Sequence, residues 1–419
     1  MMARDTDVLI IGAGAVGLSG AYYLRQRGLS VRIVEKGVPG SGASLKNCGL
    51  ICPSHYVPLS HPGMMLAGLK WMLDPVSPFY VKPRFDMGLI SWVMKFRKAS
   101  RVERANRSMP LLYELNAMSA DLYREIAARK IFSFNYDEKG LLLVYNTPKG
   151  REENIAEAEI GTKFGIPITE VKAGEIGSID PNLRLKSGGA FHYATDTHMS
   201  PQKFVEGMAG HLTKEGVDIV TGAEVTGIDT KNSAVEAVRT AKGEFRAKEY
   251  VLAGGAWSEG LVRPLGLKLP IQPAKGYSIT FPRTPDMFST PMILTERKVA
   301  ITPLGDRVRY GGTLELAGFD LAINMRRVRA IADAVPVYLK DVTVPSFTED
   351  DVWAGLRPCS PDGLPYVGRT RKFKNLVTAA GHAMLGITLS PVTGKLVSEI
   401  VTGRTPSVDC TLLRPERFA

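Results

Sequence analysis

The sequence is poor in cysteine and histidine, and it lacks any hydrophobic run long enough to cross a membrane. Four cysteines, at positions 48, 52, 359 and 410, are spread over 419 residues. So few cysteines provide no disulfide framework, which is typical of a protein in a reducing compartment. Cys48 and Cys52 are separated by three residues, and this spacing matches no common zinc or thioredoxin-like motif. The sequence therefore predicts no metal site, and the pair is interpreted as packing residues.

Acidic residues are outnumbered: 42 Asp and Glu face 53 Lys and Arg, for a net charge of +11. The basic residues are scattered and form no recognised nucleic-acid-binding motif, so we expect no nucleic-acid partner. A membrane surface or an anionic substrate explains the charge better. The first apolar strand begins close to Met1 and leaves no room for an export signal, so we expect a cytoplasmic protein.

The length of 419 residues exceeds one typical core, and two connected domains are expected. The apolar run at 8–11 has the character of a buried parallel strand, and a Gly-x-Gly-x-x-Gly pattern follows it at Gly12, Gly14 and Gly17. Gly12 allows a tight turn, Gly14 lets the backbone approach a diphosphate, and Gly17 lets the helix at 16–27 pack on the strand. The amides at the start of that helix suit a bound diphosphate.

A second apolar strand at 31–34 ends at Glu35, about 20 residues beyond the glycines. An acid at this position accepts hydrogen bonds from both ribose hydroxyls and repels a 2′-phosphate. The first 35 residues therefore predict a dinucleotide-binding unit that disfavours NADP.

The remaining sequence alternates between patterns typical of strands and patterns typical of helices. A loop is expected at 37–58, strands at 139–146, 217–228, 235–240, 244–255, 275–283, 299–315 and 375–382, and helices at 101–130, 150–164, 322–340 and 391–403. The two ends of the chain have the character of a dinucleotide-binding domain, and the middle that of a separate antiparallel domain.

Four stretches together resemble one family. They are the fingerprint at 12–17, AKEYVLAGGAWS at 247–258, WAGLRPCSPDGLPYVG at 353–368, and AAGHAMLGITLSPVTGKLVSEIV at 379–401. In this order they resemble the FAD-dependent oxidoreductases of the D-amino-acid oxidase superfamily. Within it the likeness is greatest to the small subunits of bacterial D-amino-acid dehydrogenases, followed by glycine oxidase and hydroxyproline dehydrogenases.

The resemblance implies an α/β fold in which a Rossmann-like FAD-binding domain is interleaved with an antiparallel-sheet substrate domain. The expected boundaries are 1–58, 150–265 and 350–419 for the FAD-binding domain, and 59–149 and 266–349 for the substrate domain. FAD is longer than the first fingerprint can cover, which explains a second glycine-rich strand and loop at 376–388. The helix after Thr388, Pro391 and Thr393 could face the flavin N1 and C2 carbonyl.

The resemblance also implies which residues hold FAD. They are Gly12, Gly14, Ala15, Val16, Gly17, Glu35 and Lys36; Ser41, Ala43, Ser44, Asn47 and Gly49; Val225, Gly254 and Trp257; and Gly381, Met384, Leu385, Gly386 and Thr388. Ser41, Ala43, Ser44 and Asn47 are expected near the diphosphate and the ring, and Val225 at the adenine.

Four side chains are candidates for catalysis. The implied reaction is oxidative deamination of an amino acid, most readily a D-amino acid including D-proline or hydroxy-D-proline types, with hydride transfer from the α-carbon to flavin N5. Arg357 aligns with the family's substrate-binding arginine, whose planar fork clamps the carboxylate. Tyr277 and Tyr310 could cover the flavin face or simply pack. His382 could touch the ring or substrate, or serve a structural hydrogen bond.

Residues 61–96 depart from the family pattern, because methionines and two tryptophans alternate there with lysines and arginines. This favours either a membrane-interface hairpin on the inner face of the cell membrane or a lid over the active site. Membrane contact would favour a quinone as the electron acceptor. An oxygen-using oxidase of the glycine or sarcosine type, or a flavoprotein subunit of a multi-subunit dehydrogenase, remains the alternative, and the oligomeric state is left open.

Overall fold

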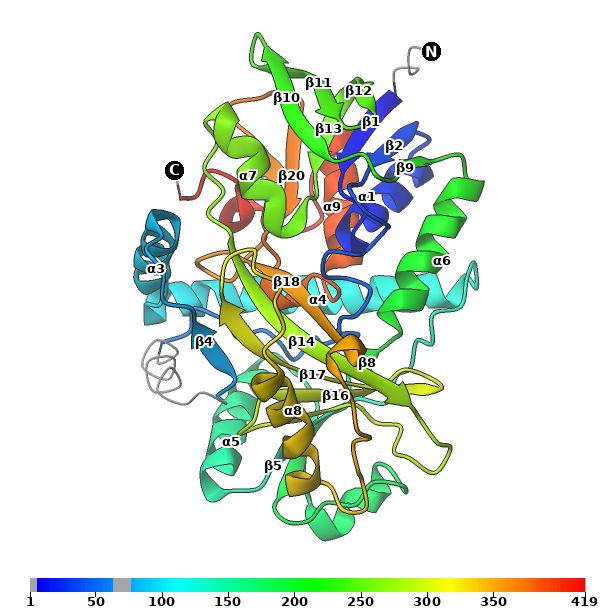
Figure 1. The fold of residues 1–419 in the computed structure, drawn as a ribbon, viewed down its shortest axis with the longest axis vertical. Helices are drawn as coiled ribbons and strands as arrows, with labels where there is room; N and C mark the ends of the chain where they lie inside the picture. Colours follow the sequence, from blue (N-terminus) through cyan, green and yellow to red (C-terminus); the bar gives the residue numbers. More distant parts are fainter. Residues whose placement is uncertain (1–5, 63–76, 419) are drawn as a thin grey trace.

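The computed structural model describes residues 6–62 and 77–418, and two large β-sheets dominate it (Figure 1). The first sheet lies in the upper half of Figure 1. In order across it, the strands are β19 (Tyr366–Arg369), β20 (Leu376–Ala380), β13 (Ala247–Leu252), β1 (Thr6–Ile11), β2 (Val31–Val34) and β9 (Asp218–Val220). All neighbours pair in parallel except β19 and β20, which are antiparallel.

The first sheet is sandwiched between helices and a small antiparallel sheet. Val8 to Ile11 of the central strand β1 are buried, as expected for a parallel strand covered on both faces. One face packs on helices α1 (Ala15–Gln26), α6 (Pro201–Lys214) and α9 (Ser390–Val401). The other face is covered by β10 (Val225–Lys231), β11 (Ala234–Thr240), β12 (Gly243–Phe245) and the short helix α7 (Ser258–Val262). This layering is the Rossmann-like arrangement that the sequence predicts.

The second sheet lies in the lower half of Figure 1 and is mostly antiparallel. In order across it, the strands are β18 (Val352–Cys359), β14 (Gln272–Pro282), β17 (Arg307–Leu316), β16 (Val299–Pro303), β15 (Met292–Leu294), β5 (Leu141–Tyr145), β7 (Gly189–Tyr193) and β6 (Ile168–Lys172), with β4 (Phe79–Val81) paired to β17. Helices α8 (Met325–Tyr338) and α5 (Pro148–Lys163) pack on it, and β3 (Leu50–Ile51) pairs with β8 (Thr197–His198) beside it.

Helix α4 (Val102–Ala128) crosses the molecule between the two sheets (Figure 1). Its leucines pack against α9, and the Tyr123 hydroxyl donates to the Ile387 carbonyl at 2.7 Å. The helix therefore fixes the loop that joins the last strand of the first sheet to α9.

Sheet membership divides the chain differently from the expected domain boundaries. Strands β6 and β7 belong to the second sheet, although 150–265 was assigned to the FAD-binding domain. Strand β18 does so too, although it lies in 350–419. The sequence of a short strand such as β6 does not indicate which sheet the strand joins. Only the strand pairing in the structure assigns these strands to the second sheet.

The segment 61–96 is described only in part, because residues 63–76 lie outside the described residues. Its described end contains β4 and the first residues of helix α3 (Met87–Ala99), which begins at the capping carboxylate of Asp86. Within the part of the chain that the structure describes, no helix combines the length and the apolar character needed to cross a membrane.

Candidate active site

A cavity lies between the two sheets, and its empty space, counted together with the open solvent at its mouth, is about 1220 Å³. Its walls come from the turns that follow β1, β2, β13 and β20 and from the end of β18. Ligands of open parallel sheets bind at the carboxyl ends of the strands, and this cavity lies there. We call it the intersheet cavity, and we call the parts of its wall around Trp257 and around Arg357 the Trp257 end and the Arg357 end.

The glycine fingerprint forms one wall of the intersheet cavity. Gly12 has a φ of +106°, and a Cβ there would overlap the backbone of Ala253. A Cβ at Gly17 would overlap the Gly12 carbonyl, so Gly17 acts in packing α1 against the turn. The N-cap Gly14 offers no side chain, and the Ala15 amide donates to the Ser44 hydroxyl at 3.1 Å. The amino end of α1 therefore faces the cavity with little but backbone amides.

Glu35 stands at the end of β2, where the sequence places it. Its carboxylate accepts hydrogen bonds from the amides of Ala13 at 2.8 Å and Gly37 at 2.9 Å. A carboxylate has about four acceptor sites, so two bonds leave capacity for ribose hydroxyls. Both amides orient the side chain toward the fingerprint turn.

The Trp257 end is closed by an ordered side-chain stack. The Lys36 ammonium lies 3.3 Å from the centre of the Trp257 ring, a cation–π contact. Burial lowers the pKa of Lys36, against the opposing influence of Glu224 and Glu35. The Trp257 ring also lies so close to Gly42 that a Cβ there would be 3.1 Å from it.

The Arg357 end is built by neighbouring strands of the second sheet. Arg357 on β18 pairs in register with Ala274 on β14, and its guanidinium lies over Gly276, two residues further along β14. Its Nη1 donates to the Thr313 carbonyl at 2.9 Å. Thr313 sits in a register shift between β14 and β17 with a φ of +63°, a left-handed conformation that costs free energy in a non-glycine residue.

Arg357 has no carboxylate partner among the described residues, and burial lowers the pKa of its guanidinium. Arg357 is partly buried, and a guanidinium withdrawn from water without a counter-ion loses free energy that an anionic ligand would restore. The arrangement therefore fits an anionic group bound at this end of the cavity.

His382 lies in the loop after β20 and also lines the cavity. Its Nε2 is 3.0 Å from the Thr393 hydroxyl, and burial lowers the pKa of the imidazole to about 3. His382 is therefore neutral at physiological pH and is held by α9, which matches the structural alternative that the sequence left open.

Sequence reasoning missed Arg309 on β17. This arginine is 4% exposed; its Nε donates to the Thr280 hydroxyl at 2.9 Å and its Nη1 to the Asn47 carbonyl at 2.5 Å. Arg309 therefore ties the loop at 40–49 to the second sheet. A basic residue between the apolar Val308 and Tyr310 was the only signal of this role.

The structure brings most of the predicted residues to the cavity. Those that line it are Gly12, Gly14, Ala15, Val16, Glu35, Lys36, Ala43, Ser44, Asn47, Val225, Gly254, Trp257, Met384, Gly386, Arg357 and His382. Those that do not are Gly17, Ser41, Gly49, Gly381, Leu385, Thr388, Tyr277 and Tyr310. Several of the second group shape the surrounding loops: Gly49 and Gly381 have φ values of +74° and +78°, and the Thr388 hydroxyl donates to the Leu50 carbonyl.

Tyr277 and Tyr310 do not line the cavity, and their positions correspond to the packing role that the sequence left open beside a contact with the flavin. Both rings are buried in the core that α8 forms on the opposite face of the second sheet. The Tyr277 hydroxyl lies 3.2 Å from Glu315 Oε2, and the Tyr310 hydroxyl is buried without a hydrogen-bond partner. Side chains alternate between the two faces of a strand, so their neighbours Gly276 and Ser278 face the cavity side, where Ser278 donates to the Lys46 carbonyl.

Comparison with known proteins agrees with this geometry. A family model described as FAD dependent oxidoreductase, the DAO family, matches residues 7–400. D-amino acid dehydrogenases from Methylobacterium radiotolerans and Granulibacter bethesdensis are 33% and 30% identical, each alignment covering 98% of this chain and 99% of the relative. The crystal structure of glycine oxidase from Geobacillus kaustophilus is 25% identical, with a TM-score of 0.75 and complete coverage of both chains.

The residues of the intersheet cavity fit FAD. Gly12 allows the tight turn against Ala253, the amino end of α1 offers amides to a diphosphate, and Glu35 stands where a ribose would bind. The cavity then continues to the second glycine-rich loop at 382–387 and to Arg357, which leaves room for a flavin ring. Since the family model spans residues 7–400 and both relatives align along nearly the whole chain, the protein belongs to the DAO family of FAD-dependent oxidoreductases and is an FAD-using enzyme.

Proposed function

We propose that the protein oxidises amino acids, D-isomers in preference to L-isomers, and passes the electrons to a quinone or another acceptor. The observation that carries the proposal is Arg357, a partly buried guanidinium that lines the cavity and has no carboxylate partner in the described residues. Its planar fork matches an α-carboxylate with two parallel hydrogen bonds. The names of the relatives from Methylobacterium radiotolerans and Granulibacter bethesdensis support an amino acid of D configuration.

The cofactor would lie along the intersheet cavity with its adenine at Val225 and the Trp257 end. Glu35 would accept the ribose hydroxyls, and the amino end of α1 would hold the diphosphate. The loop around His382 and Gly386 would support the flavin next to Arg357. When bound, FAD supplies the acceptor for the hydride that leaves the substrate α-carbon.

The protein's own groups at the Arg357 end bind and orient rather than exchange protons. Arg357 would fix the carboxylate, and His382 is neutral and bonded to Thr393. Among the described residues that line the cavity, the carboxylates are those of Glu35 and Glu224, and both act on Lys36. The substrate amine would therefore have to arrive unprotonated, and kcat/KM is expected to rise with pH until the amine is neutral.

A panel of amino acids with an artificial electron acceptor tests the substrate class. We expect purified FAD-loaded protein to oxidise D-alanine and D-proline faster than their L-isomers and faster than glycine. Faster turnover of the L-isomers, or none with any amino acid, would refute the proposal. Oxygen consumption at a comparable rate would identify the glycine or sarcosine type of oxidase, and a flavin that no amino acid reduces would favour a non-catalytic flavoprotein subunit.

We further propose that the enzyme meets the inner face of the cell membrane through helix α3, where it would reach a quinone. Met87, Ile90 and Met94 share one face of the helix and are 65%, 41% and 62% exposed. Basic side chains follow at Lys95, Arg97 and Lys98. This combination is typical of helices that lie in a membrane interface.

The opposite face of α3 supports the lid interpretation at the same time. Leu89 and Trp92 are buried there, and the Trp92 indole donates to the Cys359 carbonyl at 2.9 Å. Cys359 is two residues from Arg357, and Ala383 of the cavity wall belongs to the same apolar cluster. One helix would thus cover the Arg357 end and present its other face to lipid.

A further inference from the structure

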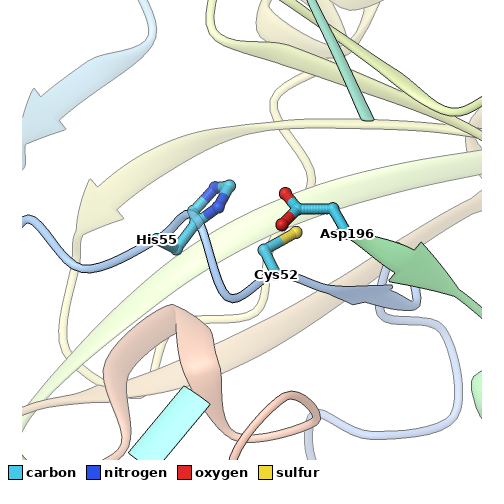
Figure 2. Close-up of side chains that lie close together, drawn as sticks. All are labelled: Cys52, His55 and Asp196. Carbon is cyan, nitrogen blue, oxygen red and sulfur yellow. The ribbon is translucent and has the colours of Figure 1, made fainter. Parts of the chain in front are cut away.

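A second cluster of chemically distinctive side chains lies outside the intersheet cavity. Cys52 and His55 follow β3, and Asp196 precedes β8, the strand that pairs with β3. One potential ligand atom from each of the three, a thiol sulfur, a ring nitrogen and a carboxylate oxygen, lies within 4.8 Å of the others. Figure 2 shows the Cys52 sulfur and the Asp196 carboxylate pointing toward one another, with the His55 ring across from the carboxylate.

The cluster is built into the protein interior. Asp196 is 0% and Cys52 2% exposed, and His55 is partly buried. Among the described residues no lysine or arginine forms an ion pair with Asp196; burial and the charge of another acid, Glu157, raise the pKa of Asp196, and hydrogen bonds from Ser54 and Cys52 oppose this. A buried carboxylate of this kind normally has a cation beside it or binds a metal.

Hydrogen bonds already hold the carboxylate in one orientation. The Ser54 amide donates to Asp196 Oδ1 at 3.1 Å, and the Ser54 hydroxyl donates to Oδ2. Such bonds from a neighbouring residue are what fix the ligands of protein metal sites. They leave each carboxylate oxygen with a further lone pair for coordination.

Two buried polar atoms around the cluster lack partners. The Tyr193 hydroxyl has no hydrogen bond, is 0% exposed, and lies close enough to Asp196 for that carboxylate to affect its pKa. Asn116 donates to the His55 carbonyl at 2.9 Å, but its own Oδ1 has no partner. Unpartnered buried polar atoms are rare in folded proteins, and here they indicate that something polar belongs in the cluster.

We propose that Cys52, His55 and Asp196 bind one Zn²⁺ ion, with a water as the fourth ligand. Thiolate, imidazole and carboxylate are all zinc donors, and three protein ligands with one open position suit tetrahedral coordination. Cys52 and His55 form a Cys-x-x-His pair, a close spacing for two ligands of one ion. The prediction that there is no metal site used only the spacing between cysteines and therefore missed this pair. Binding would release the Cys52 thiol proton, and the Tyr193 hydroxyl would meet the bound water.

The ion would join parts of the chain that are about 140 residues apart. Cys52 and His55 directly follow the loop at 40–49 that lines the intersheet cavity, whereas Asp196 lies between β7 and β8 beside the second sheet. Zinc would therefore hold the cavity loop against the second sheet, a role distinct from the redox reaction.

Metal analysis of the FAD-loaded protein tests the site directly. Protein produced with zinc in the medium and dialysed against metal-free buffer is expected to retain about one zinc per chain. Cys52→Ser and Asp196→Asn should reduce this content at least tenfold. Cys410→Ser removes a partly buried thiol that does not belong to the cluster and should leave the zinc content unchanged.

X-ray absorption of the wild-type protein keeps the test independent of how the variants fold. The expected zinc shell has one sulfur at about 2.3 Å and nitrogen or oxygen neighbours at about 2.0–2.1 Å. Wild-type protein that holds less than about a tenth of an equivalent even after zinc is added back would overturn the proposal. So would a zinc shell without sulfur, or zinc that both cluster variants retain.

Discussion

The guanidinium of Arg357 lies over Gly276 of the neighbouring strand, so closely that a Cβ at position 276 would overlap it. The proposed clamp therefore depends on a residue that carries no functional group. Thr313 completes the support, since its carbonyl accepts from Arg357 at 2.9 Å.

Gly276→Ala is expected to displace the clamp without removing its charge. A misplacement of about 1 Å can cost on the order of 100-fold in kcat/KM, so the loss should be large for a carboxylate substrate. Steady-state kinetics together with the FAD content measure it. Gly210→Ala is the matched control, since a Cβ there meets nothing within 4 Å. Equal kinetics for both variants would show that Gly276 does not position the clamp.

Arg357→Ala should leave FAD bound but weaken the carboxylate substrate. Truncating one partner of a buried charge pair costs about 2–5 kcal/mol, which corresponds to a loss of roughly 30-fold to several thousand-fold in kcat/KM. Arg357→Lys should recover part of it, because an ammonium keeps the charge but not the fork. Amines without a carboxylate should change little. A decrease below about threefold for a carboxylate substrate would place the clamp elsewhere.

Gly17→Ala should reduce FAD retention, because a Cβ would overlap the Gly12 carbonyl and push α1 away from the fingerprint turn. Gly20→Ala on the same helix is the control, since its Cβ would lie 3.7 Å from Ile10 Cδ1, an ordinary contact. The ratio of flavin to protein absorbance after gel filtration measures both. Equal ratios in the two variants would mean that the fingerprint tolerates the displacement.

His382 is expected to make the stability of the folded protein depend on pH. Burial lowers the imidazole pKa from 6.5 to about 3 in the folded protein, so between these values the unfolded chain binds a proton that the folded chain does not. Stability should therefore decrease as pH falls below 6.5, by up to about 1.4 kcal/mol per pH unit from this group. Denaturant titrations from pH 7 to pH 4.5 should show a shallower decline for His382→Gln. Parallel declines would contradict a buried neutral imidazole.

The triple variant Met87→Gln, Ile90→Gln and Met94→Gln tests the membrane contact. Vesicles that contain anionic phospholipid are expected to sediment with the wild-type protein, and the variant should bind at least fivefold less, because the apolar face of α3 is gone. Val337→Gln is the control, since Val337 is a 47% exposed apolar residue on α8. Vesicle binding that the triple variant retains would exclude α3 as the contact.

The fingerprint and Glu35 could be predicted because each depends on local sequence, and Arg357 because the family resemblance implies it. A strand, a turn and a helix follow one another within 35 residues, and the acid falls at the end of the next strand. The structure places Glu35 and Arg357 on the cavity, as expected.

Which face of the second sheet Tyr277 and Tyr310 occupy could not be predicted from local sequence. Residues Gln272 to Ser278 of β14 are buried on both faces of the strand, so alternation of polar and apolar residues does not show which face meets the cavity. The left-handed backbone of Thr313 and the proximity of Cys52 to Asp196 could not be predicted either. Both arise from contacts between segments that are distant in the sequence, and no local motif indicates such contacts.

Anaerobic mixing of the FAD-loaded enzyme with single amino acids tests the central claim most directly. With oxygen and artificial acceptors absent, the visible flavin absorbance reports only electron transfer from the substrate. We predict rapid bleaching by D-alanine or D-proline, slower bleaching by the L-isomers, and rates for the D-isomers that fall at least 30-fold in Arg357→Ala. A flavin that stays oxidised with every amino acid, or that the L-isomers bleach faster, would contradict the account.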